Sequence, residues 1–294
     1  MTLLRQSKNT NKPVIRQILD LIPTHILRAE IAKHQSDKGK SAYKTRDQLE
    51  ALTFGQLNKC YTLSDISCGL SVSSTFLSDL GLKQSPAKST MSDGNKIRHY
   101  GVFKDLYSSL LKYYKHSLKA KHQSHIIDEI QKHKIKIIDS TTISLCLSLF
   151  NWAKYRTAKG RLKIHTVWDD QLGLPDEKDH DILKDEIIVL TSNKAMKQNL
   201  QIKTFLGTSE NAVKSQIYVA LICYLLLELV KRFYSDKKTA FSNFCEKIRV
   251  CLMHYLTLNY VCNELKPIVK KAKKTPENTF FDRDNSAQQT SLPL

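Results

Sequence analysis

The stretch Lys134-Ile-Lys-Ile-Ile-Asp-Ser-Thr-Thr-Ile143 decides the fold that we expect for this chain. Its isoleucines occupy both phases of the strand alternation, a pattern typical of a central β-strand covered on both faces. The run delivers one carboxylate, Asp139, followed by three hydroxyl residues. A buried strand holds such a carboxylate rigidly, and hard cations such as Mg2+ prefer oxygen ligands. The pattern therefore predicts either a metal-binding Asp139 or a strand end whose carboxylate accepts hydrogen bonds from loop amides.

A second strand is expected over residues 162–170, where apolar and polar residues alternate. Leu162, Ile164 and Trp168 share one face, and Lys163 and His165 share the other. A turn at Gly160 precedes it, so we expect it to pair antiparallel with the first strand. Lys163 and His165 are then either contacts for a DNA phosphate beside the metal or simply the polar side of the strand.

The N-terminal part of the chain, residues 11–118, is expected to be almost entirely helical. Its helix-start signals are Pro13 in a first turn, Thr24 and Thr62 as caps, and a capping-box pattern at residues 45–48. Apolar residues recur at helical spacing after each of these signals. This regularity predicts a bundle of short helices.

A further helix is expected to begin near Pro86, with Ser85 as its N-cap. Two short helical segments, near 62–70 and 73–80, precede it in the order of a helix-turn-helix. Its polar face offers small and basic groups that suit phosphates and base edges, although an ordinary solvated face would look the same. The candidate DNA-binding residues are Lys88, Ser89, Ser92, Asn95, Lys96 and Arg98.

Composition restricts the class of partner. The 294 residues include 46 Lys and Arg against 28 Asp and Glu, for a net charge of +18. Such an excess favours a polyanion, and an anionic membrane surface or a ribosomal site would suit the charge as well as DNA does. The seven cysteines contain no C-x-x-C pair, which indicates reduced thiols in a cytosolic protein. The longest apolar run, 217–230, falls short of the about 20 residues that span a membrane, so we expect a soluble protein.

Three consecutive segments resemble the first catalytic block of bacterial insertion-sequence DDE transposases. They are Ile137-Ile-Asp-Ser-Thr-Thr142, Asn151-Trp-Ala-Lys-Tyr-Arg156 and Lys159-Gly-Arg-Leu-Lys-Ile-His-Thr166. Residues 10–115 and 197–213 also resemble that family, and all the segments follow its order. The resemblance implies metal-dependent DNA cleavage and strand transfer at element ends, by a helical DNA-binding domain joined to an RNase H-like core.

Two of the three acidic residues that the family uses are missing. In the family, two Asp and one Glu hold a pair of metal ions at the phosphodiester. Asp139 matches the first Asp. The stretch in which the family carries its second Asp is missing between Asp170 and Pro175, and the stretch with its Glu is missing between Ala195 and Lys197, as two internal deletions would leave the sequence. We therefore expect Mg2+ or Mn2+ to bind poorly at Asp139 and catalysis to be lost. The remaining acids that we considered match the motif nowhere: Asp170, Asp185, Glu186 and Glu228.

These observations predict an α+β chain in four parts. They are a helical DNA-binding domain (1–118), a basic linker (119–133), a shortened RNase H-like domain with C-terminal helices (134–264), and a basic, disordered tail (265–294).

The function expected from the sequence is that of an inactive DNA transposition protein located in the cytoplasm on the bacterial nucleoid. Its partners would be double-stranded DNA at terminal inverted repeats, and a second copy of itself or an intact transposase, with no membrane. The main alternative is a DNA-binding repressor that occupies element ends without cutting. A basic membrane-surface protein is a third interpretation.

Overall fold

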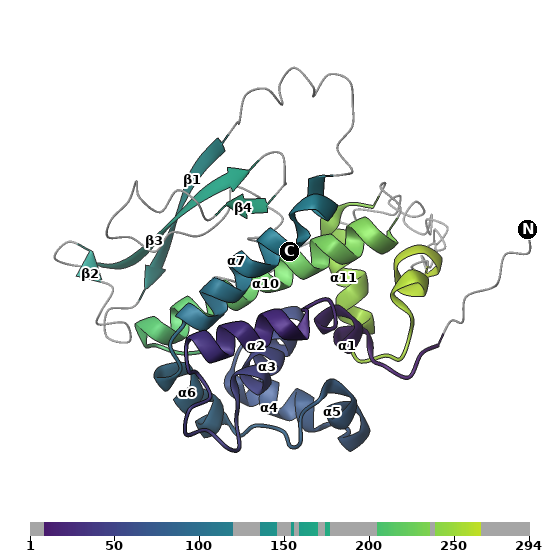
Figure 1. Ribbon diagram of the computed structural model, residues 1–294, viewed down its shortest axis with the longest axis horizontal. Coiled ribbons are helices and arrows are strands. Elements are labelled where there is room, and N and C mark those ends of the chain that lie inside the picture. The colour runs from purple at the N-terminus through teal and green to yellow at the C-terminus, as the bar shows by residue number, and fades with distance from the viewer. Residues whose placement is uncertain are drawn as a thin grey trace, which may run out of the picture. The chain divides into compact units, whose positions relative to one another are not determined.

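The computed structural model describes a set of helices and the strands of one small sheet (Figure 1). The chain divides into two compact units, residues 1–264 and residues 265–294. The second unit begins where we expected the basic tail, and beyond Leu265 it lies outside the described residues. The same is true of the expected linker beyond Lys119. The described residues are 9–119, 136–145, 154–155, 159–169, 174–176, 205–235 and 239–265.

The N-terminal part is helical, as predicted, although two of the expected start signals act differently. Thr24 is the first residue of its helix and not its cap, and the helix expected to be capped at residue 45 has Lys44 as its N-cap. Pro13 stands directly before α1, and the Thr62 hydroxyl accepts a hydrogen bond from the Asp65 amide at the start of α4. Ser73 caps α5 in the same way through the Phe76 amide. The helices of this part are α1 (Val14–Leu19), α2 (Thr24–Lys33), α3 (Thr45–Leu57), α4 (Leu63–Ser71), α5 (Ser74–Leu80), α6 (Lys88–Ile97) and α7 (Gly101–Lys119).

The helix expected to begin at Pro86 begins two residues later. Ala87 is the N-cap of α6, and no side chain caps it. Ser85, which we predicted to cap this helix, instead donates its hydroxyl hydrogen bond to the Ser67 carbonyl at 2.8 Å. Ser85 therefore bonds to α4 and does not cap α6 as the local sequence pattern predicts.

The helical core is organised around α10 (Glu210–Tyr234), which is buried over most of its length. It packs against α7, α3, α6 and α1, and Figure 1 shows it running alongside α7. Its length and apolarity would allow it to cross a membrane, but 89% of its most apolar 18-residue stretch is buried inside the protein. Such burial is typical of the core helix of a soluble protein, which is what the sequence led us to expect. Two shorter elements follow, α11 (Phe241–Cys251) and the π-helix η2 (Tyr260–Glu264).

The first and last segments of the helical body are hydrogen-bonded to each other. The amides of Val14 and Ile15 donate to the carbonyls of His254 and Leu252, each at 3.0 Å. The Gln17 side chain donates to the Leu256 carbonyl at 2.7 Å. Because these bonds join residues more than 230 positions apart, α1 and the segment after α11 are built as one structure.

The two long strands expected from the sequence are present and pair antiparallel. β1 (Lys136–Leu145) pairs with β3 (Lys159–Asp169) over ten residue pairs. Two short strands, β2 (Lys154–Tyr155) and β4 (Leu174–Asp176), also pair antiparallel with β3. All four strands therefore come from one local stretch of the chain.

The expected α+β class with an RNase H-like domain is wrong for the described part of the chain. That part is mainly helical, and its strands form one local antiparallel sheet without a parallel pair or a helical crossover between them. The apolar run Glu186-Ile-Ile-Val-Leu-Thr191 is typical of a further short strand, and it lies outside the described residues. We also assigned the C-terminal helices to the strand-containing domain, yet α10 is the centre of the helical core. The reason is that α10 is apolar around most of its circumference and needs helices on several sides to bury it.

Candidate nucleic-acid interface

Helix α6 exposes only part of the predicted DNA-binding face. Lys88, Ser89 and Lys96 lie on the surface, and Ser92 is half-buried. Asn95 and Arg98 are each only 4% exposed. These two residues are therefore not available to a duplex, and they are removed from the candidate contacts.

Arg98 connects the end of α6 to the loop that precedes α3. Its guanidinium donates hydrogen bonds to the Tyr43 carbonyl at 2.8 Å, to the Ser36 carbonyl at 3.4 Å and to the Gln48 side chain. It also lies 3.9 Å from an Asp37 carboxylate oxygen. Burial lowers the pKa of Arg98, whereas the charge of Asp37 acts in the opposite direction. An arginine remains charged under these conditions, so its buried charge is balanced by the loop.

Two asparagines, Asn95 and Asn211, connect α6 to α3 and α10. The Gln48 amide donates to the Asn95 side-chain oxygen at 2.7 Å, which joins α3 to α6. Asn211, at the start of α10, donates to the carbonyls of Asn95 and Arg98 at 2.8 and 2.6 Å and accepts from the Tyr100 amide at 2.9 Å. The last carbonyls of a helix have no partner within that helix. A residue more than one hundred positions away in the sequence therefore caps α6.

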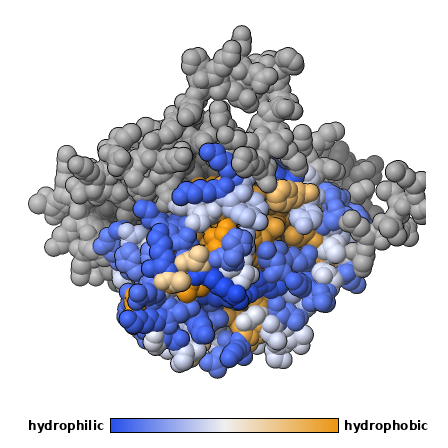
Figure 2. Space-filling view, viewed as in Figure 1, coloured by the Kyte–Doolittle hydropathy of each residue, from blue (hydrophilic) through white to orange (hydrophobic). Residues whose placement is uncertain are grey.

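The loop held by Arg98 is rich in exposed lysines. Tyr43 packs against α6 at Gly94, where an added Cβ would lie 2.9 Å from the tyrosine ring. Gly94 is thus the point where the loop approaches the helix closely. Figure 2 shows hydrophilic residues over much of the described surface on the face in view. The loop and α6 together make a surface that we call the basic platform, whose exposed lysines are Lys38, Lys40, Lys44, Lys88 and Lys96.

The platform differs from the helix-turn-helix that we expected. The tight turn, residues 72–73, lies between α4 and α5, whereas residues 81–87 separate α5 from α6. Gly81 ends α5 with a φ of +100°, a conformation that favours glycine. α4 contacts both α5 and α6, so the three helices are neighbours without the short turn before the third.

The predicted catalytic and strand residues lie in the sheet, where only the backbone is described. Asp139 pairs with Thr166, whereas His165 pairs with Ser140 and Lys163 with Thr142. Directly paired positions share a face of the sheet, and successive positions along a strand alternate between faces. Position 139 therefore belongs to the same face as 166 and to the opposite face from 163 and 165. This register does not support one site in which Lys163 and His165 hold a phosphate beside a metal ion on Asp139.

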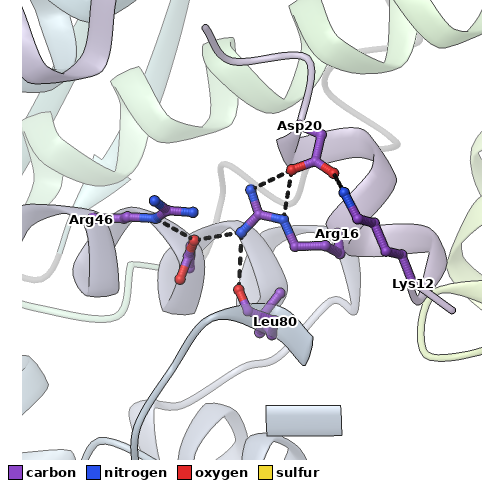
Figure 3. A network of polar contacts seen from close by, with 6 residues as sticks. Lys12, Arg16, Asp20, Arg46 and Leu80 are labelled. Carbon is purple, nitrogen blue, oxygen red and sulfur yellow. Dashed lines mark hydrogen bonds and ion pairs between the residues drawn. The ribbon is translucent and has the colours of Figure 1, made fainter. Parts of the chain in front are cut away.

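The charged groups of a second cluster pair with one another and are not part of the platform (Figure 3). Arg16 donates to Glu50 at 2.8 Å, to the Leu80 carbonyl at 3.0 Å and to Asp20 at 2.9 Å, and Arg46 donates to the same oxygen of Glu50 at 3.0 Å. Burial raises the pKa of Glu50, although both arginines oppose the shift. The cluster joins α1, α3 and the end of α5, which makes it a structural element.

Comparison with known proteins gives one match. A family model described as "Domain of unknown function (DUF4372)" matches residues 10–83, the segment from the start of α1 to the end of α5. Domains of this family are common in transposase-like proteins. No curated protein and no solved structure matches the chain.

Proposed function

We propose that this chain is a transposase-like protein that binds double-stranded DNA at the ends of an insertion element without cleaving it. The observation that carries the proposal is the basic platform, in which buried Arg98 fixes a lysine-rich loop against α6. Lysines held on a rigid surface neutralise phosphates at a smaller cost in conformational entropy than lysines on a mobile loop.

Two further observations support the proposal. The matched domain, common in transposase-like proteins, includes the lysine-rich loop and helices α1 to α5. The net charge of +18 also favours a polyanion as partner. Cleavage is not part of the proposal, because two-metal chemistry needs several convergent carboxylates and the sequence supplies one, Asp139, at a position that matches the family motif.

A gel-shift titration on duplexes that carry the element's terminal inverted repeats tests the proposal. We expect the repeat duplex to bind more tightly than a scrambled duplex of equal length. In the K38A/K40A/K44A variant, the slope of log affinity against log salt should fall by up to about 3, because each lost phosphate contact removes about 1. The K112A/K115A variant removes exposed lysines from α7 as a matched control and should keep the wild-type slope.

The result that contradicts the proposal is equal weakening by the platform and control substitutions, or no preference for the repeat duplex. A strand-transfer assay with Mg2+ or Mn2+ tests the second half of the proposal. We expect no product from the wild-type chain. Product that disappears in D139N would show that the chain is an active enzyme.

A further inference from the structure

Three potential metal ligands gather between α2 and α7. Glu30 lies in the last turn of α2, His34 is the residue that ends this helix, and Asp105 lies in the first turns of α7. One ligand atom of each residue lies within 4.8 Å of the other two. The His34 Nε2 atom is 2.8 Å from an Asp105 carboxylate oxygen. Glu30 and His34 share one helix face because they are four residues apart.

Glu30 is buried with one oxygen left unsatisfied. The residue is 8% exposed, and its Oε1 atom accepts a hydrogen bond from the Ser109 hydroxyl at 2.7 Å. Its Oε2 atom is buried and has no hydrogen-bond partner. A buried carboxylate oxygen without a hydrogen-bond partner is destabilising, so this atom is the independent sign that something else belongs in the cluster.

A lysine ammonium now lies beside the cluster. The Lys33 Nζ atom is 2.6 Å from the Asp105 carboxylate and 4.0 Å from Glu30 Oε2, too far to donate a hydrogen bond to the latter. The Lys33 side chain is 63% exposed, so it is able to turn outward into solvent. The cluster thus attracts positive charge, but the Lys33 ammonium leaves the Oε2 atom of Glu30 without a hydrogen bond.

We propose that Glu30, His34 and Asp105 bind one Zn2+ ion, with Lys33 occupying the site in its absence. One imidazole nitrogen and two carboxylate oxygens are a ligand set that suits zinc, with water in a fourth position. Mg2+ fits poorly because it prefers oxygen ligands in octahedral geometry. The Ser109 hydroxyl orients Glu30 by donating a hydrogen bond to its Oε1 atom, as residues around metal ligands commonly do. The ion fastens the end of α2 to α7.

Isothermal titration of the metal-free full-length chain with Zn2+ tests this site. We expect one ion per chain in the wild type, and loss of binding in H34A and D105N. The K33A variant should bind Zn2+ more tightly, because the competing ammonium is gone. The S109A variant should bind about 10-fold more weakly. H25A is the matched control, since His25 is an exposed histidine of the same helix, and it should bind as the wild type does.

Two further measurements make the result decisive. Zn2+ should raise the melting temperature of the wild type and H25A but not of D105N, and Mg2+ at the same concentration should raise none of them. Co2+ used as a spectroscopic substitute should show no thiolate charge-transfer band, which separates this site from the free cysteines. The proposal is overturned if the wild type binds no Zn2+, if H34A and D105N keep full affinity, or if K33A binds more weakly than the wild type.

Discussion

Replacing Arg98 by alanine tests the physical basis of the basic platform. The substitution removes a buried guanidinium that donates to Gln48 and to the Tyr43 carbonyl at 2.8 Å, with a longer bond to the Ser36 carbonyl at 3.4 Å. Hydrogen bonds from a charged group contribute about 1.5–3 kcal/mol each. Counting only the bonds to Gln48 and Tyr43, we expect R98A to lower the free energy of unfolding by about 3–6 kcal/mol.

Urea denaturation followed by far-UV circular dichroism measures this loss, and calorimetry should show a fall in melting temperature of roughly 10 °C. Limited proteolysis gives a local readout, because loop 36–44 should be cut faster in R98A than in the wild type. R98K keeps the charge but not the planar fork, so it should fall between the two. The surface variant K96A should leave stability unchanged.

A loss of less than about 1 kcal/mol in R98A, the value of an ordinary solvated side-chain contact, would show that Arg98 is not an internal support. Cleavage of the loop at the wild-type rate in R98A would show that the guanidinium does not hold the loop to α6.

Two further predictions concern the cap of α6 and the ion pairs of Asp20. N211A removes three hydrogen bonds at the end of α6 and should cost about 2–3 kcal/mol in urea denaturation, whereas a cost near zero would show that water replaces this cap. The second concerns pH. Burial acts to raise the pKa of Asp20, but the hydrogen bonds and charges of Lys12 and Arg16 lower it below its usual 3.8. This carboxylate therefore stabilises the fold above pH 3.8. The stabilisation is lost as the pH falls through the lowered pKa. D20N should therefore be less stable than wild type by about 0.5 kcal/mol at pH 7, allowing for partial exposure of the pair, and the difference should vanish in strong acid; a difference independent of pH would contradict this.

Local signals in the sequence predicted most helix positions. Thr62 and Ser73 cap α4 and α5 as their side chains allow, and α10 is buried as its apolar run requires. The antiparallel pairing of the two long strands also followed from alternation and a turn. These features depend on contacts within a few residues or on the total apolarity of one segment, and both are visible in the sequence.

The long-range partners were not predictable in this way. Arg98 was assigned to DNA because a basic group at the end of this helix suits a phosphate, whereas its hydrogen bonds to the loop carbonyls of Ser36 and Tyr43 show why it is buried. Glu30 and Asp105 stand far apart in the sequence, so no local pattern brings them together.

The amino-acid sequence was enough to locate most of the helices and to show the excess of positive charge. That the core is built on α10 and that Arg98 is an internal support became visible only in the folded chain. The physical reason is that the sequence shows how much apolar surface and charge a segment carries. Which distant segment covers that surface or balances that charge depends on packing among all the helices together.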